Sequence, residues 1–147
     1  MKETILGGIG VIGGFLLTLI GGWSESLTTL VIFMIVDYIS GLIVAGVFRR
    51  SSKSETGGLE SKAGWKGLAR KCMTLVFVLI ACRLDILLNT TFVRDAVVIG
   101  FICNEAISIV ENAGIMGLPV PKPIVNAIDV LNKKTNSEVK NENVKKE

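Results

Sequence analysis

The sequence predicts an all-α membrane protein with about four transmembrane helices, both termini in the cytoplasm, and a disordered, charged C-terminal tail. Half of its 147 residues are apolar and the mean hydropathy is +0.57, which is high for a soluble domain of this length. The apolar residues form four blocks, near 5–22, 27–48, 72–88 and 92–110. Each block approaches the roughly 20 residues that a helix needs to cross about 30 Å of hydrocarbon.

The basic residues give the orientation of these blocks. With four spans, every Lys and Arg except Arg83 and Arg94 falls on one side of the membrane. Because positive residues mark cytoplasmic loops, we expect the N-terminus, the loop 49–71 and the C-terminus in the cytoplasm. Residues 1–123 form the transmembrane domain, and residues 124–147 form a short surface helix and the disordered tail. The expected location is the bacterial cytoplasmic membrane, with several passes.

The first block, ILGGIGVIGGFLLTLIGG, is rich in glycine. Gly10 and Gly14 are one helical turn apart, a spacing that allows a second helix to approach closely. The same spacing also occurs by chance in a flexible, glycine-rich span. If this block is cleaved as a signal peptide, or only lies on the surface, three spans remain.

The second block contains Asp37 close to its centre, followed by Ser40 and Gly41 on the same helical face. A carboxylate at mid-bilayer costs about 2.5–3.5 kcal/mol on insertion scales, so it normally faces a partner helix or water. This face is therefore predicted to meet protein or water rather than lipid.

The loop 49–71 is rich in basic residues. In its second half Lys62, Lys66 and Arg70 recur every four residues, with Trp65 on the other side. This pattern suits a short interfacial helix, but a plain cytoplasmic loop is the favoured explanation of the charges. The residues expected at the membrane surface are Arg49, Arg50, Lys62, Lys66, Arg70 and Lys71.

The third block carries two charges, Arg83 and Asp85, which point to nearly opposite sides of a helix. Arg83 either extends toward the outer surface or pairs across helices with Asp37 or Glu105.

The fourth block becomes amphipathic in its cytoplasmic half. Glu105, Ser108 and Asn112 form one stripe, flanked by Asn104 and Glu111. These side chains, with Asp37, Ser40, Arg83 and Asp85, are the predicted pore-lining or helix-packing polar residues. Gly117, Pro119 and Pro121 end the helix and mark the exit from the membrane.

The residue inventory argues against an enzyme. The chain has no histidine, no Gly-x-Ser-x-Gly sequence and no phosphate-binding glycine loop. Its three cysteines form no Cys-x-x-Cys pair, so we expect neither a metal site nor a disulfide framework, and no cofactor. Polar faces on apolar helices leave three functions open: a hole-forming assembly, a small multidrug-type proton-coupled exporter, or a structural or regulatory membrane subunit.

Several motifs in order resemble the holin family of phage lysis and toxin secretion. Asp37 with Gly41 looks like the Asp–Gly signature of its early span, and the segment from Ser61 to Lys71 is similar to its loop ending in Gly-x-x-Arg-Lys. Asp85 falls where the family closes the next span with Asp. The segment NEAISIVENAGIMGLPVPK is similar to the family's Asn-Glu…Ser-Ile-x-Glu-Asn…Gly-x-Pro-x-Pro ending. The resemblance runs from about Val36 to Pro123.

This resemblance implies a holin, which accumulates in the cytoplasmic membrane and oligomerises into lesions. An endolysin or a secreted toxin would leave through them, without direct contact, and the cell would lyse. The implied partners are the lipid bilayer and further copies of the chain, with no nucleic acid. An antiholin, which regulates a holin, shares these features.

Overall fold

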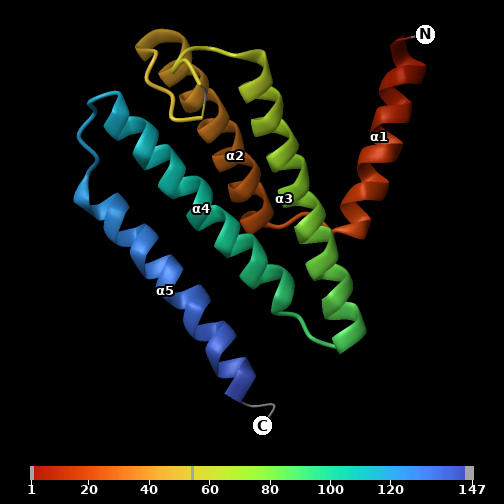
Figure 1. The fold of residues 1–147 in the computed structure, drawn as a ribbon. Coiled ribbons are helices and arrows are strands. Elements are labelled where there is room, and N and C mark those ends of the chain that lie inside the picture. Colours follow the sequence, from red (N-terminus) through yellow and green to blue (C-terminus); the bar gives the residue numbers. More distant parts are fainter. Residues whose placement is uncertain (1, 54, 145–147) are drawn as a thin grey trace.

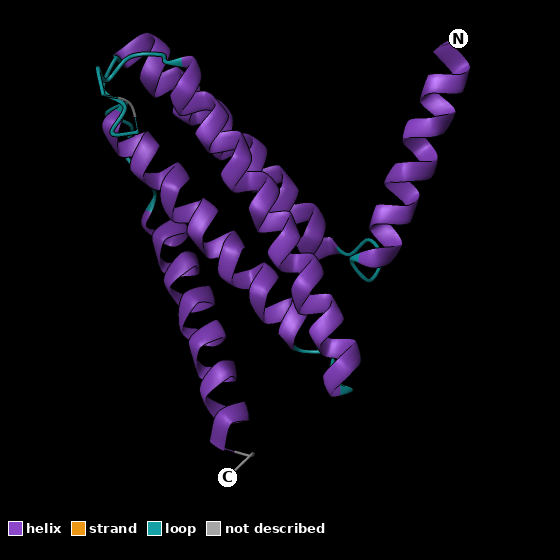
Figure 2. Cartoon of the chain, turned by 45° about the vertical axis from the view of Figure 1, so that its right-hand side comes forward, coloured by secondary structure: helices purple, strands orange, loops and turns teal. Residues whose placement is uncertain are grey.

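The structure is a computed structural model that describes residues 2–53 and 55–144, and this part of the chain is helical, with no strand. The all-α prediction is therefore confirmed. The helices are α1 (Lys2–Leu19), α2 (Glu25–Ile43), α3 (Ser61–Leu88), α4 (Val93–Ile115) and α5 (Lys122–Val144). A π-helical turn, η1 (Val44–Phe48), continues α2. In Figures 1 and 2, α2, α3 and α4 form a bundle, α5 runs antiparallel along α4, and α1 stands apart.

A small apolar core holds the bundle together. It consists of Leu27, Leu30 and Met34 from α2, Val78 from α3, and Val98 and Ile102 from α4. The outward faces of the same helices are also apolar, with Ile32 and Ile39 each 51% exposed. Helices that are apolar on both faces suit a lipid surround, because water would make their outer surface unfavourable.

One helix of the described residues is long and apolar enough to cross a membrane by length and composition alone. It comprises α2 and η1 together, Glu25–Phe48. Ser24 begins this helix, since its hydroxyl accepts a hydrogen bond from the Leu27 amide at 3.2 Å. Its bounds match the predicted block 27–48 closely.

Helix α3 differs from the prediction at its N-terminal end. The sequence suggested a loop to residue 71, with a separate interfacial helix as one alternative, but a single helix runs from Ser61 to Leu88. In this N-terminal part α3 packs against Tyr38 of α2. A Cβ at Gly64 or Gly67 would lie 3.5–3.6 Å from the Tyr38 hydroxyl or ring, which is ordinary contact distance, so the Tyr38 side chain lies directly over these two glycines.

Helix α5 extends much further than the short surface helix that the sequence suggested. The tail from Lys133 was expected to be disordered, whereas the helix continues to Val144. Hydroxyl groups in this part bond back to carbonyls of the same helix: the Thr135 hydroxyl donates to the Leu131 carbonyl at 3.0 Å, and the Ser137 hydroxyl donates to the Lys133 carbonyl at 2.7 Å. These bonds satisfy the hydroxyl groups but do not themselves stabilise a helix. Residues 145–147 lie outside the described part of the chain.

Two glycines set the direction of α1 relative to the bundle. Gly21 and Gly22 both have φ of +84°, a conformation that residues with a side chain rarely adopt. A Cβ on Gly21 would lie 2.9 Å from the Cys82 sulfur. Arg94 of α4 donates to the Gly22 carbonyl at 2.9 Å, so the linker is held against the ends of α3 and α4.

Candidate functional site

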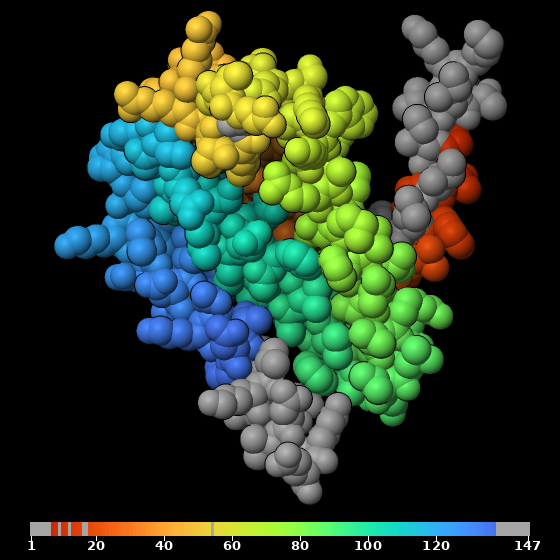
Figure 3. Space-filling model, in the orientation of Figure 1, coloured from red at the N-terminus to blue at the C-terminus, as the bar shows by residue number. Residues whose placement is uncertain are grey.

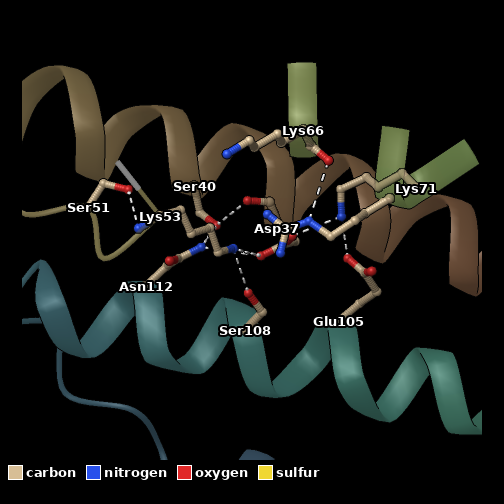
Figure 4. Close-up of polar contacts among 10 residues, drawn as sticks. Asp37, Ser40, Ser51, Lys53, Lys66, Lys71, Glu105, Ser108 and Asn112 are labelled. Carbon is tan, nitrogen blue, oxygen red and sulfur yellow. Dashed lines mark hydrogen bonds and ion pairs between the residues drawn. The ribbon is translucent and has the colours of Figure 1, made fainter. Parts of the chain in front are cut away.

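A cluster of ion pairs lies where α2, α3 and α4 meet, as Figure 4 shows. The Lys71 ammonium donates to Asp37 Oδ2 at 2.8 Å and also to Glu105 Oε2. Asp37 and Glu105 are 7% and 6% exposed, and Lys71 is mostly covered. Buried charges are costly unless paired, so one lysine holds two carboxylates from two different helices inside the bundle. We call Asp37, Lys71 and Glu105 the ion cluster.

Neutral polar side chains complete the surroundings of Asp37. The Asn112 amide donates to Asp37 Oδ1 at 3.3 Å and to the Ser40 hydroxyl at 2.8 Å. The Ser40 hydroxyl in turn donates to the Asp37 carbonyl at 3.0 Å. These bonds tie α2 to α4 beside the ion cluster, and a Cβ on Gly41 would lie 3.8 Å from the same Asn112 amide. Gly41 thus packs directly against the Asn112 side chain, where only a small residue fits.

The helical periodicity explains why these residues converge. Asp37, Ser40 and Gly41 share one face of α2, and Glu105, Ser108 and Asn112 share one face of α4. Lys71 stands at the beginning of the apolar part of α3, and its long side chain turns inward to reach both faces.

A cleft of about 540 Å³ opens next to the ion cluster, between α2, α3, α4 and the loop 49–60. Figure 3 shows a hollow on this face between the loop, α3 and α4, with α2 at its floor. Its lining includes Tyr38, Lys53, Asn104, Glu105 and Ser108. The lining also contains apolar side chains such as Leu42, Phe77 and Phe101, and the open side of the cleft lets water approach the ion cluster from one end of the bundle.

Lys53 lies across this cleft. Its ammonium donates to the Ser108 hydroxyl at 3.2 Å and lies 3.7 Å from Asp37 Oδ1. Its side chain is 40% exposed, so this contact is screened by solvent and weaker than the Lys71 pairs. With Lys53 in place, two lysines balance two carboxylates and the site is neutral overall.

The loop that carries Lys53 is held in shape by its own contacts. The Thr56 hydroxyl and amide donate to the Glu60 carboxylate at 2.7 and 3.0 Å, and these bonds lower the pKa of Glu60. The Ser51 amide donates to the Gly57 carbonyl at 2.9 Å, and Gly57 adopts φ of +73°.

Asp85 has a separate role at the opposite end of the bundle. Its carboxylate accepts from the Thr90 hydroxyl at 2.6 Å and from the Val93 and Arg94 amides at 3.0 and 2.8 Å. It therefore satisfies the free amides at the start of α4 and fixes the turn between α3 and α4.

Two expectations about lysine and arginine are corrected here. Lys71 was expected at the membrane surface, but its ammonium lies in the ion cluster. Arg83 was expected either to pair with Asp37 or Glu105 or to extend outward. Its side chain is exposed, and it takes part in none of the ion pairs of the described residues. The structure therefore contradicts the pairing and agrees with the outward orientation. The physical reason is position along the helix: Lys71 lies level with both carboxylates, whereas Arg83 lies more than three turns further along α3.

Of the other residues predicted to line a pore or pack between helices, some make contacts within the bundle and others are exposed. Ser108 is half-buried against Lys53, whereas Asn104 and Glu111 are exposed. The remaining basic residues predicted at the surface are exposed: Arg49, Arg50, Lys62, Lys66 and Arg70. A Cβ on Gly10 or Gly14 would meet nothing within 4 Å, so no other helix in the described part of the chain packs on them. Gly117, with φ of +77°, Pro119 and Pro121 form the turn between α4 and α5.

Sequence reasoning missed Lys53 as a site residue. The only available signal was the formal charge of the polar faces, since two buried carboxylates require two nearby cations. Among the residues that the structure describes, no group of three His, Cys, Asp or Glu side chains could hold a metal ion.

The fold and the site define a class: a small all-helical protein with apolar outer faces suited to lipid, in which Asp37, Lys71 and Glu105 are turned inward and paired with one another. Comparison with known sequences gives the family. The chain belongs to the bacteriophage holin family, which it matches over residues 14–133. This family is not enzymatic, and its members permeabilise membranes.

Individual relatives support the assignment over nearly the whole chain. An uncharacterized protein of Listeria innocua is 38% identical over 139 residues, covering 94% of this chain and 91% of the relative. An uncharacterized protein of Clostridium perfringens is 35% identical, covering 86% and 92%. A protein of Bacillus phage phi105 named a probable holin is 29% identical, covering 75% and 76%. No solved structure matches the chain significantly.

Proposed function

We propose that this protein is a holin that spans the cytoplasmic membrane four times, with both termini inside, and oligomerises into lesions that cause lysis. An endolysin or a toxin without its own export signal would leave through them. Family membership, the phage relative and the one-sided distribution of basic residues support this proposal.

The observation that carries the mechanism is the ion cluster. Asp37 and Glu105 face inward within one chain and are neutralised there by Lys71. In a dispersed subunit this pairing keeps both carboxylates away from lipid, where a charge is costly. The apolar faces that α2 and α3 turn outward then form the surface that meets hydrocarbon.

The same side chains provide a polar surface when many subunits gather. If α2 and α4 separate along the cleft, Asp37, Ser108 and Glu105 become accessible to water, and solvation replaces the buried ion pairs. A lesion lined by these faces is stable because each newly exposed charge is hydrated. Loss of the membrane potential favours the same step, since one charge crossing 100 mV changes the energy by about 2.3 kcal/mol.

Cysteine accessibility tests this rearrangement. In a variant with Cys72, Cys82 and Cys103 replaced by Ala, Ser108→Cys lies at the cleft and should react slowly with a water-soluble thiol reagent before lysis and much faster from the moment of lysis. Val98→Cys, in the apolar core of the same helix, is the matched control and should stay protected. A reaction rate of Ser108→Cys that does not change through lysis would exclude this face as a lesion wall.

Inducible expression with a co-expressed endolysin tests the function itself. A holin should stop growth suddenly and release the endolysin, and Glu105→Gln should change the timing of lysis. Resistance to toxic compounds without lysis would identify an exporter instead. A delay in lysis by a second, known holin would identify an antiholin.

A further inference from the structure

Helix α5 occupies a position that conflicts with a membrane-spanning α4. It runs antiparallel along α4, so it lies beside the segment 92–110 that is predicted to cross the bilayer (Figures 1 and 2). The contact is close at Gly100, where a Cβ would lie 3.9 Å from the methyl group of Thr135. Gly100 is near the middle of that segment, so Thr135 lies level with the middle of the span.

The charges of α5 make this arrangement incompatible with hydrocarbon. Lys133 and Lys134 are within one turn of Thr135, and Asp129 lies less than two turns away, with all three side chains exposed. At 1.5 Å per residue, Thr135 is about 20 Å along α5 from its start at Lys122. If α4 spans the bilayer, these charges would lie deep in hydrocarbon and facing lipid, a position that charged side chains avoid. Helix α5 must then leave α4.

The residues of α5 indicate where it goes. Ile124, Ile128 and Leu131 lie on one face with Thr135, which contacts α4 at Gly100. Ile124 and Leu131 of this face are 49% and 37% exposed even when α5 is packed on α4. Lys134 borders this apolar face, and Lys122 and Lys133 lie on the opposite, polar face. A helix with an apolar face and lysines on its polar face is suited to lie in the plane of an anionic membrane surface.

We propose that α5 is a reversible membrane-docking helix whose partner is the anionic surface of the lipid bilayer. It packs on α4 while α4 is outside the membrane, and it moves to the cytoplasmic lipid surface when α4 crosses. The turn from Gly117 to Pro121 connects the two helices and lets α5 change direction, because Gly117 already has φ of +77° and Leu118 is 57% exposed. This inference rests on the membrane-spanning α4 of the proposed function.

The first experiment locates α5 in vesicles by tryptophan fluorescence. The full chain carries Trp23→Phe, Trp65→Phe and Leu131→Trp, and is reconstituted in phosphatidylcholine with or without phosphatidylglycerol. Brominated lipids with a shallow label should quench the new tryptophan strongly, and phosphatidylglycerol should increase that quenching. Asn126→Trp, on the opposite face of α5, is the matched control and should be quenched much less.

Charge removal tests the role of the lysines. Lys133→Gln with Lys134→Gln should lower the ratio of surface-bound to released α5 about thirty-fold in phosphatidylglycerol vesicles, since each basic residue near an anionic surface contributes roughly a factor of five. Lys62→Gln with Lys66→Gln removes the same charge from α3 and should leave the fluorescence of α5 unchanged. Equal effects from both pairs would overturn the assigned surface.

A cross-linking experiment separates this inference from the topology on which it rests. In the cysteine-free background, Gly100→Cys alone should be protected from a water-soluble maleimide in vesicles if α4 spans the membrane. Gly100→Cys combined with Thr135→Cys should then fail to form a bismaleimide cross-link. A protected Gly100 with an efficient cross-link to Thr135 overturns membrane docking of α5 while α4 still spans. A Gly100 cysteine that reacts freely overturns the spanning α4, and the inference with it.

Discussion

Removing the Lys71 ammonium should destabilise the bundle more than removing any other lysine of the described residues. Lys71→Met keeps the length and apolar stem of the side chain but leaves Asp37 and Glu105 without their shared cation. Asp37 keeps Lys53 at 3.7 Å and the Asn112 amide at 3.3 Å. Glu105 has no other ion pair among the described residues, so it carries most of the penalty.

The expected size follows from the burial of Glu105. Breaking a buried ion pair by removing one partner costs about 3–5 kcal/mol. Because the adjoining cleft lets water reach the Glu105 carboxylate, the loss in unfolding free energy should lie near the lower end of this range, at about 3 kcal/mol. For a chain of this size, 1 kcal/mol changes Tm by roughly 2–4 °C, so Lys71→Met should lower Tm by roughly 6–12 °C.

Thermal unfolding in detergent micelles, followed by the helical circular dichroism signal, measures this change. Adding Glu105→Gln to Lys71→Met should restore most of the lost stability, and adding Asp37→Asn should restore less, because Asp37 keeps other partners. Lys66→Met, on the exposed face of the same helix, is the control and should change Tm little. If Lys71→Met and Lys66→Met unfold at the same temperature, the ion cluster does not hold the bundle together and this reasoning is wrong.

Three further predictions use the same unfolding measurement. Asp85→Ala leaves the Val93 and Arg94 amides without their acceptor and should lower the free energy of unfolding by about 1–2 kcal/mol. Asp95→Ala, which is exposed in the first turn of α4, should lower it less, and equal losses would reject Asp85 as the helix cap. Gly41→Ala should be tolerated because its Cβ would lie at ordinary contact distance from Asn112. Gly41→Leu should lower the free energy of unfolding by about 1–3 kcal/mol because the larger side chain pushes α2 away from α4. Gly46→Leu, where a Cβ would meet nothing within 4 Å, should leave it unchanged. Lys53→Gln should lower the free energy of unfolding by no more than about 1 kcal/mol, and by less at high salt. It should nevertheless make lysis earlier in the endolysin-release assay. Unchanged lysis timing would show that the Lys53 contact with Asp37 does not restrain the separation of α2 and α4.

The apolar pattern of the sequence predicted the apolar parts of α1 to α4 and the polar faces of α2 and α4 that meet, but not the N-terminal part of α3 or the length of α5. The spacing of Asp37, Ser40 and Gly41, and that of Glu105, Ser108 and Asn112, each define a stripe on one helix, and the structure brings these two stripes together. Such stripes follow from the geometry of single helices, so no tertiary information is needed to find them.

The identity of the cation was not predictable in this way. Lys71 and Arg83 both lie on the third apolar helix, and both have side chains long enough to turn inward or toward the surface. Their heights relative to Asp37 and Glu105 depend on how α3 is placed along α2 and α4. That placement is set by contacts such as Tyr38 against Gly64 and Gly67, which no helical period reveals.

The C-terminal helix shows a different reason for failure. Its sequence from Lys133 is polar and poor in apolar residues, which is typical of disorder. Packing against α4 at Gly100 supports it where composition alone does not. A segment stabilised in this way depends on its neighbour, and its structure should change when that neighbour moves.

The linker at Gly21 and Gly22 joins α1 to the other helices at one point, which acts as the pivot of α1. This linker contacts Cys82 of α3 and Arg94 of α4, so a small change in the spacing of α3 and α4 rotates the 18 residues of α1. At 1.5 Å per residue the far end of α1 lies about 27 Å from this pivot, and each degree of rotation there moves it by about half an ångström. The first apolar segment can thus transmit the packing state of one subunit to whatever lies beside it in the membrane.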